Sequence, residues 1–286
     1  MRYEAPESVE GAVALLSAAT GEARVLAGGT DLLVQMRADI VDPELIVDIK
    51  KIAETRAVTE EKGGWRIGAA VTGAELKEHA RLRRAWPGVV EAANLIGSTQ
   101  VQGRATLGGN LCNGSPAADS VPALIAAGAV ATLAGPQGRR DLPVEDVMLG
   151  PRKLALKKGE IVVSFLLPPR PPRSSDAYLR FIPRTEMDIA VVGAGVSLTL
   201  DGSGTISAAR ISLGAVAARV LLVQEAAQAI IGSRLDAPAQ QRLEAAARAA
   251  CRPIDDKRGT IEFRTDVAAV LARRTALIAL DRARTS

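Results

Sequence analysis

The segment Thr106-Leu107-Gly108-Gly109-Asn110-Leu111-Cys112-Asn113-Gly114-Ser115-Pro116-Ala117-Ala118-Asp119 decides the fold that this sequence is expected to adopt. It combines glycines, small residues and short polar side chains. The apolar run after it, Val121 to Val130, predicts a helix with Pro122 in its first turn. A helix beginning offers unpaired N–H groups and a partial positive charge, and glycines let a large anion approach the backbone closely. The segment is therefore expected to be an anion-binding loop.

A second double-glycine segment, Ala27-Gly28-Gly29-Thr30-Asp31, lies upstream. It follows a predicted strand over residues 23–27 and leads into a predicted helix over residues 31–38. Thr30 should cap that helix, with Leu32, Leu33 and Met36 pointing inward. Either segment alone is also typical of an ordinary strand-to-helix turn. Together they favour a dinucleotide, whose pyrophosphate would meet successive N–H groups while an acidic side chain binds ribose hydroxyls.

The composition indicates a folded chain without a nucleic-acid or membrane function. The 286 residues are 48% hydrophobic and 24% charged, which supports a sizeable core and allows two domains. Aromatic residues make up only 2%, so stacking surfaces for bases are scarce, and the net charge of +4 is spread along the chain. The N-terminus does not resemble a signal peptide, and no apolar run is long enough to span a bilayer. We therefore expect a cytoplasmic protein.

The pattern along the chain predicts an α+β fold in two parts. Residues 1–55 should form a compact β-α-β unit. Residues 56–172 should continue with strands over 65–71, 130–134 and 160–167 and with several helices, one of them opened by a capping box at Thr72. The stretch Pro168-Pro169-Arg170-Pro171-Pro172 is predicted to be a stiff spacer and the domain boundary. Strands over 177–182, 189–200 and 206–213 should then precede three helices in residues 173–286.

A glycine motif, a single histidine and two cysteines could each indicate a cofactor-binding or catalytic site, but the residues around them do not support one. Val191-Val192-Gly193-Ala194-Gly195 resembles the opening of a Rossmann fingerprint, but Leu198 stands where its third glycine should be. Because a strand pattern continues there, close strand packing is expected instead. The single histidine, His79, lies on a polar helical face, which predicts a surface residue and excludes a Ser-His-Asp arrangement. Cys112 and Cys251 are too few for an iron–sulfur or zinc site, so we expect no catalytic or metal-binding residue in this chain.

With these motifs in view, the sequence resembles a known family, the FAD-binding (medium) subunits of molybdenum hydroxylases of the carbon monoxide dehydrogenase and xanthine dehydrogenase type. The resemblance covers nearly the whole chain. It rests on AGGTDLLVQMR (27–37), IGAAVT (67–72), TLGGNLCNGSPAADSVPAL (106–124), GEIVVSFLLP (159–168) and RTEMDIAVV (184–192). It implies an FAD-binding domain of the PCMH or vanillyl-alcohol-oxidase-like fold over residues 1–172, with subdomains of about 1–55 and 56–172. A smaller α+β domain over residues 173–286 would follow.

The resemblance also implies which residues contact FAD. The first segment would contribute Val25, Ala27, Gly28, Gly29, Thr30, Asp31 and Leu32, whose backbone N–H groups would meet the pyrophosphate. The second segment would contribute Thr106, Gly109, Asn110, Asn113 and Asp119, with Asp119 on the ribose or adenosine side. Ile161 or Val162 matches an apolar contact near the flavin, and Arg180 occupies a position where relatives often carry a lysine near the isoalloxazine.

The resemblance further implies the FAD-carrying subunit of a three-component oxidoreductase. A large molybdenum-cofactor subunit would oxidise the substrate, and a small subunit with two 2Fe-2S clusters would pass electrons to this chain. The FAD here would then reduce NAD, a quinone or oxygen. The assembly is expected to be a dimer of heterotrimers. Two alternatives stay open: a free-standing flavin oxidase of the same fold, and a subunit that has lost its flavin and only bridges partners.

Overall fold

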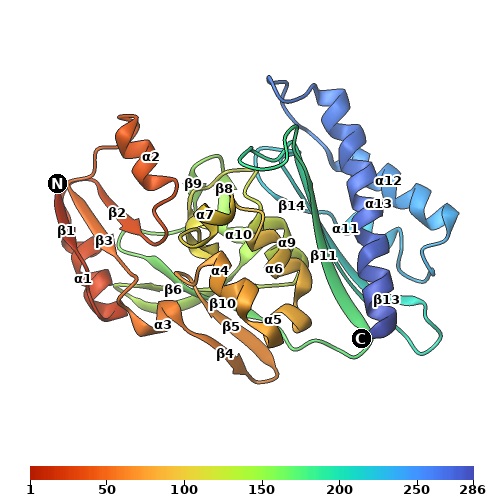
Figure 1. The fold of residues 1–286 in the computed structure, drawn as a ribbon, viewed down its shortest axis with the longest axis horizontal. Helices are drawn as coiled ribbons and strands as arrows, with labels where there is room; N and C mark the ends of the chain where they lie inside the picture. Colours follow the sequence, from red (N-terminus) through yellow and green to blue (C-terminus); the bar gives the residue numbers. More distant parts are fainter.

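The computed structural model describes residues 1–286 and contains three larger β-sheets and one small one. A three-stranded sheet lies at the N-terminal end, a five-stranded sheet in the middle, and a four-stranded sheet toward the C-terminus. Figure 1 shows them following one another along the longest axis of the molecule, with the helices between and beside them. This mixture of helices and strands confirms the predicted α+β class.

The N-terminal unit is a small parallel sheet. Its elements are β1 (Arg2–Glu4), α1 (Val9–Ala18), β2 (Ala23–Leu26), α2 (Leu32–Arg37) and β3 (Leu45–Asp48). Strand β3 lies in the middle and pairs in parallel with both β1 and β2. All four of its residues are buried, as is typical of a parallel strand covered on both faces. The predicted β-α-β unit is therefore present.

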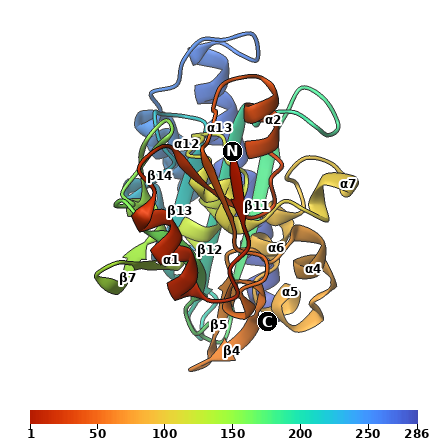
Figure 2. The same ribbon diagram turned by 90° about the vertical axis from the view of Figure 1, so that its left-hand side faces the viewer.

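The predicted inward face of α2 is wrong. The helix contains no buried residue, and the side chains of Leu33 and Val34 are 52% and 63% exposed. It begins after Asp31, so Thr30 is not its cap. Figures 1 and 2 show α2 standing outward at one edge of the molecule. A helix of only six residues is too short for its apolar pattern to determine which side faces the core.

The middle sheet is antiparallel throughout. Its elements are β4 (Val58–Glu61), β5 (Gly64–Gly68), β6 (Val130–Gly135), β7 (Gly138–Pro143) and β10 (Ile161–Leu167), with α3 (Ala53–Arg56) beside β5. Strand β10 lies in the centre between β5 and β6. The predicted strand over 160–167 is present within one residue. The strand predicted over 65–71 ends at Gly68, because the chain turns so that the N–H of Ala70 donates to the carbonyl of Thr55 (2.8 Å).

A layer of short helices covers this sheet. It consists of α4 (Gly73–Glu78), α5 (Ala80–Ala85), α6 (Pro87–Ala93), α7 (Thr99–Gln102), α8 (Leu107–Cys112), α9 (Ser120–Ala126) and α10 (Val144–Val147), followed by the hairpin β8 (Met148–Gly150) and β9 (Lys153–Leu154). The predicted capping box at Thr72 is present. His79, predicted to be a surface residue, is half-buried: its Nδ1 accepts from the N–H of Leu82, and its ring lies edge-on to Trp65.

The C-terminal unit is an antiparallel sheet covered by helices. Its elements are β11 (Ser174–Phe181), β12 (Val192–Leu200), β13 (Ile206–Gly214), β14 (Leu221–Leu222), α11 (Gln224–Gln228), α12 (Ala237–Ala250) and α13 (Ile261–Thr285). The long helix α13 packs on β11 and β12, as Figure 1 shows. On β12, a Cβ atom at Gly195 would lie 2.5 Å from the carbonyl oxygen of Pro122 in α9. The glycines of this strand thus permit close packing, as predicted, and form no Rossmann motif.

The predicted stiff spacer over residues 168–172 makes specific polar contacts through Arg170. The guanidinium of Arg170 lies 4.2 Å from the ring centroid of Trp86, and it pairs with Asp176 at 2.9 Å. The other carboxylate oxygen of Asp176 accepts from the N–H of Val89 in the first turn of α6 (3.1 Å). In the last turns of α13, Arg282 pairs with Glu91 of α6. The middle and C-terminal sheets are therefore joined by a buried ion pair at Asp176 and a partly exposed one at Arg282.

Candidate functional site

A cavity of about 670 Å³ lies between the N-terminal sheet and the middle sheet. Its walls come from the end of β2, the loop into α2, α8, the β8–β9 hairpin and the beginning of β10. The predicted site residues that line it are Val25, Ala27, Gly28, Gly29, Thr30, Asp31, Leu32, Thr106, Gly109, Asn110, Asn113, Ile161 and Val162. Asp119 and Arg180 do not line it. Both double-glycine segments therefore face one cavity.

A network of charged and polar side chains fixes the beginning of the first segment, residues 27–32. Lys50 Nζ donates to the carbonyl oxygen of Ala27 (3.0 Å) and pairs with Asp48 Oδ2 (2.8 Å), which also accepts from Tyr3 OH (2.5 Å). Although burial opposes it, donation by Lys50 and Tyr3 keeps the pKa of Asp48 below its usual value. The ion pair of Lys50 with Asp48, called the anchor below, therefore fixes the backbone of the first segment at Ala27.

Glycine is required in this segment by geometry. A Cβ atom at Gly28 would lie 2.0 Å from the carbonyl oxygen of Arg104, and Gly29 has a φ of +80°. Because Gly28 lies so close to Arg104, the first segment is in direct contact with the residues that precede the second segment. The two segments are thus packed on each other.

Backbone donors of the first segment are left without partners. The N–H groups of residues 28–32 donate no hydrogen bond within the chain, whereas the next donor, Leu33 N, bonds Gly29 O (3.0 Å). Successive free N–H groups on a cavity wall form an anion-binding concavity. Asp31 lies at its end, where burial raises the pKa of the carboxyl group.

The second segment differs from its prediction. Its first half, Leu107–Cys112, is the helix α8, because Thr106 Oγ1 caps it by accepting from the N–H of Gly109 (3.0 Å), whereas residues 113–119 form the predicted loop. The N–H of Gly108 donates to the carbonyl of Ala69 (3.1 Å). These two donors are therefore used inside the chain. A Cβ atom at Gly109 would have only Thr106 Oγ1 within 4 Å, so this glycine leaves open space beside the cavity.

Asn110 in α8 and Asn113 at its C-terminal end form side-chain hydrogen bonds with residues next to the cavity. Asn110 Oδ1 accepts from both the N–H and the hydroxyl of Ser120 (3.0 and 2.7 Å), and its Nδ2 has no partner within the chain. Asn113 Oδ1 accepts from Gln35 Nε2 of α2 (2.9 Å). The carbonyl ends of both side chains thus have structural partners, which leaves the amide of Asn110 available to a ligand.

Asp119 and Arg180 pair with each other outside the cavity. Arg180 Nη1 lies 2.8 Å from Asp119 Oδ2, and Tyr178 OH donates to Asp119 Oδ1 (3.1 Å). Burial raises the pKa of Asp119 to about 6, although Arg180 and Tyr178 oppose the increase. Asp119 directly precedes Ser120, so this pair is one residue away from the partner of Asn110. The sequence analysis did not identify Tyr178, because nothing marks a tyrosine within a strand as a partner of a distant acid.

Four cationic residues on the cavity wall were also missed: Arg24, Arg152, Lys157 and Lys158. The pair Lys157-Lys158 directly before the predicted strand was the only signal in the sequence. Cys112 also lies on this wall with an exposed side chain, and desolvation raises the pKa of its thiol to about 12. The cavity is thus richer in positive charge than the predicted residues indicate.

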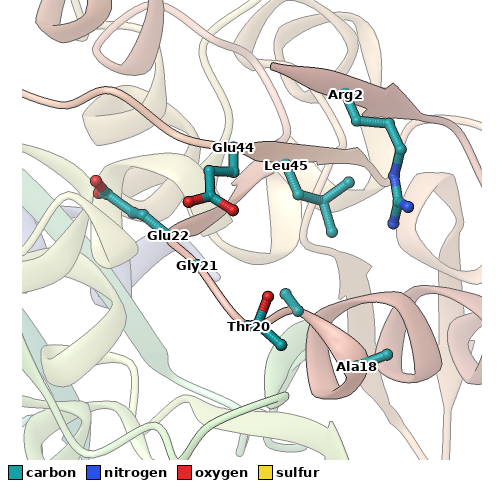
Figure 3. A pocket seen from close by; sticks show the side chains of 8 residues that line it. Arg2, Ala18, Thr20, Gly21, Glu22, Glu44 and Leu45 are labelled. Carbon is teal, nitrogen blue, oxygen red and sulfur yellow. The ribbon is translucent and has the colours of Figure 1, made fainter.

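A smaller cavity of about 180 Å³ adjoins the first, since Ala19 and Gly21 line both. Figure 3 shows the carboxylates of Glu22 and Glu44 at its wall. No predicted residue lines it, and its acidic character does not suit a phosphate. No group of three or more metal-binding side chains occurs, and no helix is long and apolar enough to cross a membrane.

The larger cavity fits a dinucleotide. Its volume lies in the usual range for small-molecule sites, roughly 300–1,000 Å³. Free N–H groups at residues 28–32 suit a pyrophosphate, and apolar Ile161 and Val162 suit a ring. The open side of Gly109 provides room for a ligand to approach α8.

Comparisons with known proteins agree with this site. Residues 1–170 match the family model described as the FAD binding domain in molybdopterin dehydrogenase, and residues 177–279 match the CO dehydrogenase flavoprotein C-terminal domain. The carbon monoxide dehydrogenase medium chain of Hydrogenophaga pseudoflava is 34% identical over 272 residues, 95% of this chain and 94% of that protein. The xanthine dehydrogenase FAD-binding subunit of Escherichia coli O157:H7 is 33% identical over 245 residues, covering 85% and 84%.

Solved structures lead to the same conclusion. The cyanide-inactivated Cu,Mo-CO dehydrogenase superposes with a TM-score of 0.94 at 35% identity, covering 99% of this chain and 98% of that one. Quinoline 2-oxidoreductase from Pseudomonas putida 86 gives a TM-score of 0.89 at 27% identity with the same coverage. Fold and site therefore define an FAD-binding subunit of an oxidoreductase. The chain belongs to the molybdopterin dehydrogenase FAD-binding family, as a medium subunit of the molybdenum hydroxylases. Its cofactor is FAD.

Proposed function

We propose that this chain carries FAD in the cavity and connects two partner subunits to an external electron acceptor. The observation that carries the proposal is the row of free N–H groups at residues 28–32, which suits the pyrophosphate. Asn110 Nδ2 would donate to the same ligand, and Val25 and Ile161 would provide apolar contact. When bound, FAD supplies exchange of electrons singly on one side and in pairs on the other.

The chain's own residues bind and orient rather than catalyse. Its only histidine is engaged between Leu82 and Trp65, and Cys112 is a neutral thiol. Neither is therefore placed as a proton acceptor for a substrate. This favours an electron-transfer role over the free-standing flavin oxidase, which would need a substrate pocket with its own base.

The proposed partners are a large subunit with a molybdenum cofactor and a small subunit with two 2Fe-2S clusters, assembled as a dimer of heterotrimers. The names of the relatives, a medium chain and an FAD-binding subunit, support a multi-subunit assembly. Electrons would pass from the 2Fe-2S clusters through this chain to NAD, a quinone or oxygen. We also propose that residues 1–172 form the FAD-binding domain and residues 173–286 the second domain, in line with the extents of the two family matches.

The test is the flavin spectrum of the purified chain. We expect absorbance typical of bound flavin at about one FAD per chain, and its loss in Gly109→Val, because the added side chain would fill the space that Gly109 leaves open. Gly202→Val is the matched control, since a Cβ atom at Gly202 in the β12–β13 turn meets nothing within 4 Å. Equal flavin content in both variants would contradict the assignment of this cavity, and a wild-type chain that never binds FAD would favour the bridging subunit.

A further inference from the structure

The charge of the cavity wall is not balanced by its acids. Arg24 pairs with Glu22 at 2.5 Å, whereas Arg152, Lys157 and Lys158 take part in no ion pair. The only acidic residues on this wall are Asp31 and Glu160. Cationic side chains on this wall therefore outnumber the acidic ones, and the two adjacent lysines have no ion-pair partner.

The acid nearest to these lysines is already neutralised. Glu160 accepts from Arg140 Nε and Nη2 (both 2.8 Å), and its side chain is only 6% exposed. Donation by Arg140 accordingly lowers the pKa of Glu160. Glu160 thus forms its bidentate ion pair with Arg140 and none with Lys157 or Lys158.

The backbone that carries the lysines is fixed in a tight turn. The N–H of Lys157 donates to Glu160 Oε2 (2.7 Å), and the N–H of Glu160 donates to the carbonyl of Lys157 (3.0 Å). Gly159 has a φ of +80°, and a Cβ atom there would lie 2.3 Å from Ser17 Oγ of α1. The turn therefore fixes the backbone of both lysines at the cavity wall, while their long side chains stay exposed.

We propose that Lys157 and Lys158 bind the diphosphate of the flavin nucleotide and so select FAD over riboflavin. This inference rests on the proposed FAD site. The free N–H groups of residues 28–32 supply hydrogen bonds but no full charge, whereas a diphosphate carries two negative charges. Two lysines on the same cavity supply the missing counter-charges.

The test is a titration of FAD or riboflavin with the apo-chain at low and at high salt. Binding is measured from the quenching of flavin fluorescence. In Lys157→Gln/Lys158→Gln we expect the Kd for FAD to rise about tenfold, as for two exposed charge contacts of modest strength. The salt dependence of FAD binding should shrink, because fewer ions are released, and riboflavin binding should not change. The control is Lys62→Gln/Lys77→Gln, which removes two exposed lysines away from the cavity.

The outcomes separate this inference from the proposed function. If the wild-type chain binds no FAD, the proposed function fails and this inference with it. If the wild-type chain binds FAD and the cavity variant binds it unchanged, or loses FAD and riboflavin equally, only the role of the lysines is overturned. A final titration adds ADP to the FAD-loaded chain. If ADP binds there and the lysine variant weakens that binding but not FAD binding, the lysines serve a second nucleotide, which also overturns the inference.

Discussion

The two double-glycine segments look alike in sequence but use their backbones in opposite ways. In residues 27–32 the consecutive N–H groups from Gly28 onward have no partner within the chain. In α8, the N–H groups of Gly108 and Gly109 are taken by Ala69 and by the capping hydroxyl of Thr106. The first segment can therefore bind an anion with its backbone, whereas the second offers space and side chains. The difference depends on whether a cap and a neighbouring carbonyl are within reach.

The strongest test of this contrast compares Gly28→Val with Gly109→Val. At Gly28 a Cβ atom would meet the backbone of Arg104 at 2.0 Å, so we expect loss of flavin together with a free energy of unfolding lowered by about 3 kcal/mol or more. Gly109→Val should lose flavin with a much smaller loss of stability. Urea unfolding of both apo-variants measures the difference. Similar destabilisation in the two would mean that both glycines serve packing alone.

Removing the anchor of the first segment should have the next largest effect. Lys50→Met deletes the donor to Ala27 O and leaves the carboxylate of Asp48 without its cation in a largely buried position. We expect a loss of about 2 kcal/mol in the free energy of unfolding and weaker FAD binding. The matched control is Lys51→Met, the exposed neighbour. An unchanged affinity for FAD in Lys50→Met would show that the first segment keeps its shape without the anchor.

The smallest effect concerns Asp119, beside the partner of Asn110. Its folded pKa of about 6 lies above its ordinary value, so the folded chain takes up a proton as pH falls from 7 to 5 while the unfolded chain does not. This group should therefore make the chain more stable at pH 5 than at pH 7 by about 1 kcal/mol. Asp119→Asn should lose this increment in pH-dependent unfolding of the apo-chain. If the variant keeps the wild-type pH dependence, Asp119 titrates normally.

Most residues of the cavity could be predicted because short local sequence patterns mark them. Glycines before predicted helices mark close approach, and the β-branched run of residues 161–167 marks a buried strand, because both properties are local. The pair of Asp119 with Arg180 depends on α9 meeting β11, which no local pattern encodes. The sequence analysis did not single out Lys157 and Lys158, because only the fold places them on the wall of the same cavity as residues 28–32. The polar neighbours of His79 in sequence likewise do not predict the contact of its ring with Trp65.

The contacts of α6 around Asp176 affect how the chain folds. Helix α6 belongs to the first half of the sequence, yet the acceptor for the N–H of Val89 comes from β11. Glu91 of the same helix pairs with Arg282 in the last turns of α13, and Arg282 also donates to the carbonyl of Asp176 (3.0 Å). The contacts that complete α6 thus come from residues 87 and 191 positions further along the chain. Contacts of such long sequence separation close large loops and so slow folding.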